Sequence, residues 1–108
     1  MSTSKDTAEY ILERLRNAPR FAVRAMFGDY ALYADGKVVA LICDNLLYVK
    51  IRPASISLES ECEKDTPYHG AKLHYVISEE QLSSLTQLPS ILFALAQSLP
   101  IKKRAHSP

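Results

Sequence analysis

The chain of 108 residues has no large excess of charge of either sign, since 13 Lys and Arg oppose 12 Asp and Glu. A dedicated nucleic-acid or membrane-surface binder carries a strong global field, so any such contact here must be local. The sequence also lacks a charged-then-apolar leader and any apolar run near the length of a bilayer span. It therefore predicts one cytoplasmic domain without membrane contact.

Cysteine and glycine are scarce as well. The two cysteines, Cys43 and Cys62, indicate reduced thiols rather than a disulfide framework. Gly28 stands alone between two β-patterned runs, with no following helix whose dipole would favour a phosphate. We interpret Gly28 as a bend between strands rather than as part of a ligand-cradling loop.

A helix is predicted near the N-terminus, over residues 6–17. Its apolar stripe has the spacing of one helix face and consists of Ala8, Ile11, Leu12 and Leu15. Asp6, followed by Glu9, resembles a capping box, and Pro19 disfavours helix at the residue before it.

The apolar period changes to two in the following segment, where Phe21, Val23, Ala25 and Phe27 recur at every second position. This pattern predicts a first strand that ends at Gly28. Three further strand patterns cover residues 30–34, 37–43 and 46–51. Two residue pairs connect these three patterns, Asp35-Gly36 and Asp44-Asn45. Both pairs tolerate the positive φ that a two-residue hairpin turn needs. The predicted fold-determining turns of this meander are therefore Gly28, Asp35, Gly36, Asp44 and Asn45.

Two-residue turns also fix the register, because directly opposed residues share a face of the sheet. The predicted register opposes Tyr33 with Val38, Leu32 with Val39, Ile42 with Leu47, and Leu41 with Tyr48. One face is then wholly apolar and carries Ala31, Tyr33, Val38, Ala40, Ile42, Leu47, Val49 and Ile51. The other face, with Tyr30, Leu32, Leu41 and Tyr48, is too apolar for a normal solvent face. We expect it to bind a partner or a second copy, or else to be covered by residues 52–72.

The second half of the chain is less regular. Residues 52–72 show no clear period, although a short helix after Pro53 is one option, and residues 73–77 alternate as a last strand. Ser78 and Gln81 form a capping box for a helix, and Pro89 suits the first turn of the next one. The prediction is an α+β fold with two layers. An antiparallel sheet of about five strands, a meander of four plus one, has the N-terminal and C-terminal helices packed on one face.

No catalytic or metal site is predicted. Cys43 with His69 or His74 is the best available thiol–base pair, but Cys43 lies beside a turn without an activating motif. Four residues could in principle bind a metal ion, but their positions lack the close Cys-Cys or His-His spacing of zinc sites. They are Cys43, Cys62, His69 and His74. We therefore predict a protein that is not an enzyme and needs no cofactor. The alternative is a small thiol-dependent enzyme or redox protein that uses Cys43.

Basic side chains offer only local contacts to phosphate. Arg20 and Arg24 share one strand face, and Lys102, Lys103 and Arg104 form a short cluster near the C-terminus. Such a cluster is also typical of a solvated chain end. Because few counterions would be released, we expect no tight autonomous binding to duplex DNA.

Several of these segments together resemble a known family. They are RAMFGDY (24–30), LYADGK (32–37), LICD (41–44), LLYVK (46–50), PYHGAK (67–72) and PIKK (100–103). As a set they are similar to the N-terminal domain of TfoX (Sxy), the regulators of bacterial natural competence, over residues 6–103. We expect residues 1–108 to form one such domain, with residues 1–5 and 104–108 as mobile tails.

The resemblance implies a compact α+β domain akin to the secretion-chaperone-like architecture, without a known catalytic site. For two-domain members it implies coactivation beside the cyclic-AMP receptor protein at competence promoters. Those members continue into a second, helical domain, whereas this chain ends four residues after Arg104. The resemblance thus favours a regulatory interaction module whose partner is a protein, such as a transcription factor, with a homodimer as a further expectation.

Overall fold

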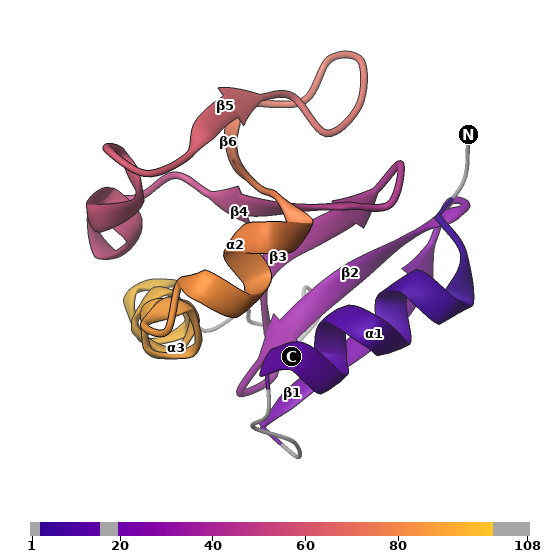
Figure 1. The fold of residues 1–108 in the computed structure, drawn as a ribbon, viewed down its shortest axis with the longest axis horizontal. Helices are drawn as coiled ribbons and strands as arrows, with labels where there is room; N and C mark the ends of the chain where they lie inside the picture. Colours follow the sequence, from indigo (N-terminus) through magenta and orange to yellow (C-terminus); the bar gives the residue numbers. More distant parts are fainter. Residues whose placement is uncertain (1–2, 16–19, 101–108) are drawn as a thin grey trace, which may run out of the picture.

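The structure is a computed structural model that describes residues 3–15 and 20–100. Within these ranges the elements are α1 (Lys5–Leu15), β1 (Phe21–Met26), β2 (Asp29–Ala34), β3 (Lys37–Cys43), β4 (Leu46–Lys50), η1 (Pro53–Leu58), β5 (Glu63–Asp65), β6 (His74–Ile77), α2 (Glu79–Ser84) and α3 (Leu88–Ser98). The strands form an antiparallel sheet in the order β1-β2-β3-β4-β6-β5 (Figure 1). The predicted α+β class is confirmed.

The first four strands form the predicted meander because three tight turns join them. Both central residues of each turn have positive φ, as the type I′ geometry requires. The φ values are 51° and 86° at Phe27 and Gly28, 50° and 82° at Asp35 and Gly36, and 52° and 62° at Asp44 and Asn45. Gly28 is therefore a bend between strands, as predicted, but it shares the turn with Phe27, which was expected to lie in the strand.

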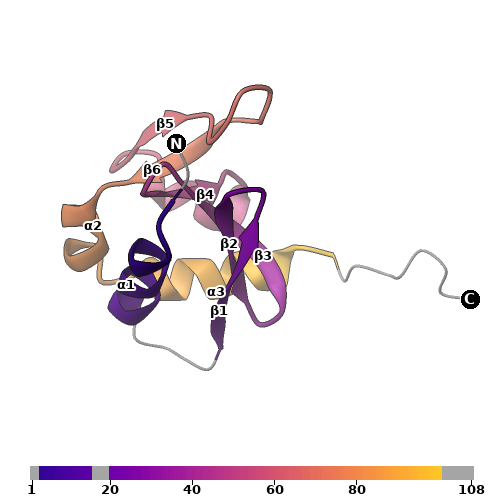
Figure 2. The ribbon, with the colours of Figure 1, turned by 90° about the vertical axis from the view of Figure 1, so that its right-hand side faces the viewer.

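The helices bury their apolar stripes on one face of the sheet, as predicted. The core cluster joins Ala8, Ile11 and Leu15 of α1, Leu82 of α2, and Leu88, Leu92, Leu95 and Ala96 of α3 to strand residues. The Phe21 ring of β1 stacks on the Phe93 ring of α3, with 4.7 Å between their centroids. Figure 2 shows α1 and α2 to one side of β2 and β3. We call this side of the sheet the helix face.

The register between β2 and β3 differs from the prediction. Tyr33 opposes Val38 as expected, but Leu32 opposes Ala40 rather than Val39, because the register shifts between Leu32 and Tyr33. The extra residue of this bulge is Val39 on β3, which has no partner of its own on β2. The β2 residues and Val38 therefore point to the opposite face from the one predicted. Tyr30 and Leu32 pack on the helix face, whereas Ala31, Tyr33 and Val38 lie on the other side of the sheet. The register between β3 and β4, with Leu41 opposite Tyr48, is confirmed.

The sheet has six strands where about five were predicted. The additional strand, β5, pairs with β6 and consists of three exposed residues, Glu63, Lys64 and Asp65. Its sequence shows no apolar alternation because neither side of the strand is buried. The segment before it contains the short 3₁₀ helix η1, at the place where a short helix was one option.

The predicted helix starts are close to the observed ones. Ser78 and Gln81 form the capping box of α2, with bonds of 3.1 Å and 3.0 Å. The cap of α1 lies earlier than expected, because the Ser4 hydroxyl accepts the Thr7 N–H at 3.1 Å. Residues 3–5 of the predicted N-terminal tail are among the described residues, and α1 begins at Lys5, while residues 1–2 and 104–108 lie outside the described residues. No helix in the described part of the chain is long and apolar enough to span a bilayer.

Candidate interaction surface

The side of the sheet opposite the helix face carries a second apolar cluster. Its buried members are Ala31, Leu41, Cys43 and Tyr48, and Met26, Tyr33, Val38, Leu46 and Val76 pack around them. We call the surface formed by these nine residues the second face. Every member belongs to a strand, so no helix contributes to the second face within the described residues. An apolar sheet face without a helical layer is a candidate for contact with another molecule.

The four residues predicted to share an interaction face are divided between the two sides. Leu41 and Tyr48 belong to the second face, as expected. Tyr30 and Leu32 instead pack in the core on the helix face. The expectation of one common surface is therefore wrong, and the bulge at Val39 of β3 is the physical reason.

Phe27 is the most exposed large apolar side chain described, with 99% of its surface accessible. It lies at the tip of the β1–β2 turn with a φ of 51°. A β-carbon makes this conformation unfavourable by about 1–2 kcal/mol, and only Gly, Asn and Asp adopt it readily. The chain thus holds a large aromatic ring in solvent at a position where neither local conformation nor the core favours it.

A hollow of about 340 Å³ lies beside this tip and is lined by Met26, Phe27, Asp29, Cys43 and Tyr68. We call it the Phe27 hollow. Met26 and Cys43 also belong to the second face, so the hollow opens at the end of that face. Tyr68, from the loop between β5 and β6, is 55% exposed. The segment 52–72 therefore borders the hollow at this point, while the alternative that it covers the second face stays a prediction.

Asp29 in the wall of the hollow is held by the N-terminal segment. The Thr3 backbone N–H and hydroxyl donate to the same carboxylate oxygen, at 3.1 Å and 2.8 Å. The Thr3 N–H also lies 3.2 Å from the carbonyl oxygen of Gly28. These contacts connect the start of the chain to the hairpin tip and fix the shape of the turn.

Cys43 is poorly suited to act as a nucleophile. Its side chain is buried, and burial together with nearby Asp29 raises its pKa to about 11. An activated thiol needs the opposite environment, with a cation or a helix N-terminus that stabilises the thiolate. The hollow thus contains a neutral thiol that contributes apolar surface.

The two histidines considered as bases do not pair with Cys43. His74 opposes Lys50 at the far end of β4, whereas Cys43 opposes Leu46 at its start. The Nδ1 atom of His74 lies 2.9 Å from the carbonyl oxygen of Lys72, and burial lowers its pKa. The His74 side chain is buried, with 9% of its surface exposed. His69 is exposed in the β5–β6 loop.

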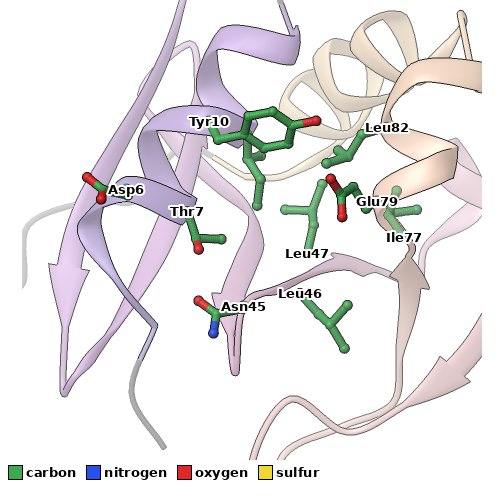
Figure 3. Close-up of a pocket in the computed structure, with 10 residues that line it drawn as sticks. Asp6, Thr7, Tyr10, Asn45, Leu46, Leu47, Ile77, Glu79 and Leu82 are labelled. Atoms are coloured by element: carbon green, nitrogen blue, oxygen red, sulfur yellow. The ribbon is translucent and has the colours of Figure 1, made fainter.

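A further groove, of about 450 Å³, lies on the helix face between α1, the β3–β4 turn and α2 (Figure 3). Its apolar residues are Ile11, Leu46, Leu47, Ile77 and Leu82, and its polar ones are Asp6, Thr7, Tyr10, Asn45 and Glu79. Figure 3 shows the Tyr10 hydroxyl directed toward α2, while Asp6 points away from the groove. The two carboxylates therefore do not form a facing acid–base pair.

Two comparisons with known proteins match this chain. The family model of the TfoX N-terminal domain matches residues 13–93. The chain belongs to the TfoX N-terminal domain family. It is also 32% identical over 103 residues to an uncharacterised 12.7 kDa protein encoded in the trpE 5′ region of Spirochaeta aurantia. That match covers 95% of this chain and 89% of the relative, so the two proteins have nearly the same extent.

The TfoX-like segment RAMFGDY builds the candidate surface, because it supplies the end of β1, the exposed turn and the start of β2. Its Arg24 guanidinium lies 5.6 Å from the ring centroid of Tyr33. Arg20 instead bonds to Asp35 at 2.8 Å and 2.9 Å and lies 3.7 Å over the Phe93 ring. The two arginines thus contact different groups and do not converge on one anion site. Lys102, Lys103 and Arg104 lie outside the described residues.

Sequence reasoning overlooked Phe27 and Tyr68 as surface residues of this TfoX N-terminal domain. The missed signal was that only two residues, Phe27 and Gly28, separate β1 from β2, whose residues pair without interruption up to Met26 and Asp29. Read as a turn, that gap would have placed Phe27 at an exposed tip. Within residues 3–15 and 20–100, no group of three or more His, Cys, Asp or Glu residues is arranged to hold a metal ion.

Proposed function

We propose that this domain is a non-catalytic regulatory module that binds a protein partner through the Phe27 hollow and the adjoining second face. The observation that carries the proposal is Phe27, 99% exposed at a φ of 51°. Unfavourable backbone geometry at an exposed position has a natural explanation when the side chain contacts another molecule. Burying the ring would remove about 150–250 Å² of mainly apolar surface from water.

The surroundings of Phe27 support a docking role. Met26, Cys43 and Tyr68 provide apolar and aromatic walls, and Met26 continues into the second face. A small concave site with an aromatic residue at its rim resembles the hot-spot arrangement of protein interfaces. We infer that a partner places an apolar side chain in the hollow while Phe27 packs against the partner.

The charges around the hollow favour a particular kind of partner. Asp29 and Asp44 both contribute to the raised pKa of Cys43, which means that the local potential is negative. A partner whose apolar anchor is flanked by Lys or Arg would match this potential. Membership of the TfoX N-terminal domain family makes a transcription regulator at a competence promoter the most concrete partner that we propose.

The test compares two variants that each replace an exposed apolar side chain with Asn. Phe27→Asn removes the ring and suits the positive φ, so the variant should remain at least as stable as the wild type. Ile56→Asn is the control, because Ile56 is 60% exposed on η1. In Figure 1, η1 lies on the opposite side of the view from the start of α1, which adjoins the hairpin tip.

Immobilised wild type and both variants are incubated with native lysate, and the captured proteins are quantified by mass spectrometry. We expect at least one transcription regulator to bind the wild type and Ile56→Asn and to be lost, by tenfold or more, with Phe27→Asn. Purified regulator should then reproduce this difference in a direct titration. Equal capture by all three proteins would refute the assigned surface.

We propose in addition that the domain does not bind duplex DNA tightly by itself. Its formal net charge is +1, and Arg20 is engaged by Asp35. Few counterions are released by such a protein, so its affinity at physiological salt is low. Fluorescence anisotropy with a labelled promoter duplex measures this directly. Nanomolar binding that is lost on deletion of residues 102–104 would contradict the proposal.

A further inference from the structure

The β1 strand lies at one edge of the sheet that the described residues form. Its register with β2 is unbroken from Phe21 to Met26, and the Asp35 N–H donates to the Arg20 carbonyl at 2.9 Å. Hydrogen bonding alternates along an antiparallel pair, so the even-numbered residues of β1 bond to β2 and the odd-numbered ones point outward. Among the described residues, no backbone hydrogen bond engages the outward groups of Val23 or Ala25.

This edge has few of the features that usually protect an edge strand. Proteins protect such edges with short strands, charges, proline or bulges. The opposite edge, β5, is protected in this way, since its three residues are all charged and exposed. In contrast, β1 has six residues with Arg24 as its single charge, and neither proline nor a bulge interrupts it.

We propose that a second copy of this chain pairs with β1 in antiparallel orientation, so that the two sheets become continuous across a two-fold axis. This goes beyond the proposed partner site, which lies at the hairpin tip rather than along the edge. The two-fold axis that relates the two β1 strands must lie at the position of one β1 residue, so that this residue opposes its own copy, rather than between two successive residues. Only then does each opposed pair lie on the same face of the joined sheet.

The charges select one axis position among the candidates. An axis at Arg24 would oppose Arg24 to its own copy, and an axis at Ala22 would oppose it to Arg20. Like charges directly opposite each other are destabilising. An axis at Val23 opposes Arg24 to Ala22 of the second copy and pairs all residues from 21 to 25. It also uses the outward backbone groups of Phe21, Val23 and Ala25 in roughly six new backbone hydrogen bonds.

The register is tested by cysteine cross-linking in a Cys62→Ser background. Ala22 and Arg24 are exposed and would form a pair without direct hydrogen bonds, in which Cα atoms lie about 4.5 Å apart. The double variant Ala22→Cys with Arg24→Cys should therefore give a disulfide-linked dimer under mild oxidation. Arg24→Cys alone, which would link only if the axis lay at Arg24, should remain monomeric on non-reducing gels. Absence of the linked dimer in the double variant would overturn the proposal.

A second variant tests the edge without introducing a cross-link. In Ala25→Pro the lost N–H is one that points away from β2, so the β1–β2 ladder is retained while new pairing is blocked. Sedimentation equilibrium should show a wild-type dimer and a monomeric Ala25→Pro variant. Circular dichroism establishes whether the variant is folded. A wild type that is monomeric at high concentration, or a folded Ala25→Pro variant that still dimerises, would contradict pairing at this edge.

Discussion

The backbone N–H and the hydroxyl of Thr3 converge on one carboxylate oxygen of Asp29, at 3.1 Å and 2.8 Å. Thr3 is 5% exposed, and its hydroxyl oxygen also accepts the N–H of Asn45 at 3.2 Å. One side chain therefore joins the N-terminal segment to both the β1–β2 and the β3–β4 turns.

Replacing Thr3 with Val should lower the free energy of unfolding by about 1–3 kcal/mol, because the buried Thr3 side chain keeps its volume but loses its part-buried hydrogen bonds to Asp29 and Asn45. Urea denaturation measures the change. Thr86→Val, at an exposed position between α2 and α3, is the matched control and should change stability by less than about 0.5 kcal/mol. Equal effects of the two substitutions would contradict the role assigned to Thr3.

The bulge at Val39 of β3 can be tested through two leucines. Leu32 is fully buried on the helix face, and Leu41 is 8% exposed on the second face. Leu32→Ala should cost about 2–5 kcal/mol, whereas Leu41→Ala should cost less because fewer layers pack over it. Similar losses for the two substitutions would favour the register without the bulge, in which both leucines lie on the second face. Nuclear Overhauser effects between Leu32 and Ala40 would establish the register independently.

Local sequence signals predicted the meander well because the hairpin turns are encoded by the residues within them. Asp35-Gly36 and Asp44-Asn45 tolerate positive φ, and the adjacent strands follow from alternation. No comparable local signal marks the bulge, since Val38-Val39-Ala40 is an ordinary strand sequence. For this reason the sequence predicted an apolar second face, but two of the four residues assigned to it, Tyr30 and Leu32, lie on the helix face.

His74 predicts a pH dependence of stability. Burial is the main cause of its lowered pKa, and nearby Lys50 acts in the same direction. Below about pH 6.5, the ordinary histidine value, the unfolded state binds a proton that the folded state binds less readily. The free energy of unfolding should therefore fall as the pH is lowered from 8 to 5.5. His74→Gln should flatten this dependence in urea denaturation, and the exposed control His69→Gln should retain it.

Cys43 should react slowly with alkylating agents in the folded protein. With a pKa of about 11, its thiolate population at pH 8 is on the order of 10²-fold below that of an ordinary cysteine, and burial slows access further. Peptide mass spectrometry after iodoacetamide labelling compares Cys43 in native protein and in urea. Similar rates in the two states would instead support the thiol-dependent alternative.

The most direct test of the central claim is a ¹⁵N–¹H spectrum of the labelled domain during titration with the regulator purified after capture. The account predicts that the largest shifts or broadening occur at Phe27, Gly28, Asp29, Cys43 and Tyr68, and that Phe27→Asn abolishes them. Unchanged resonances at these residues, with shifts instead at Tyr10 and Glu79 around the groove of Figure 3, would contradict it.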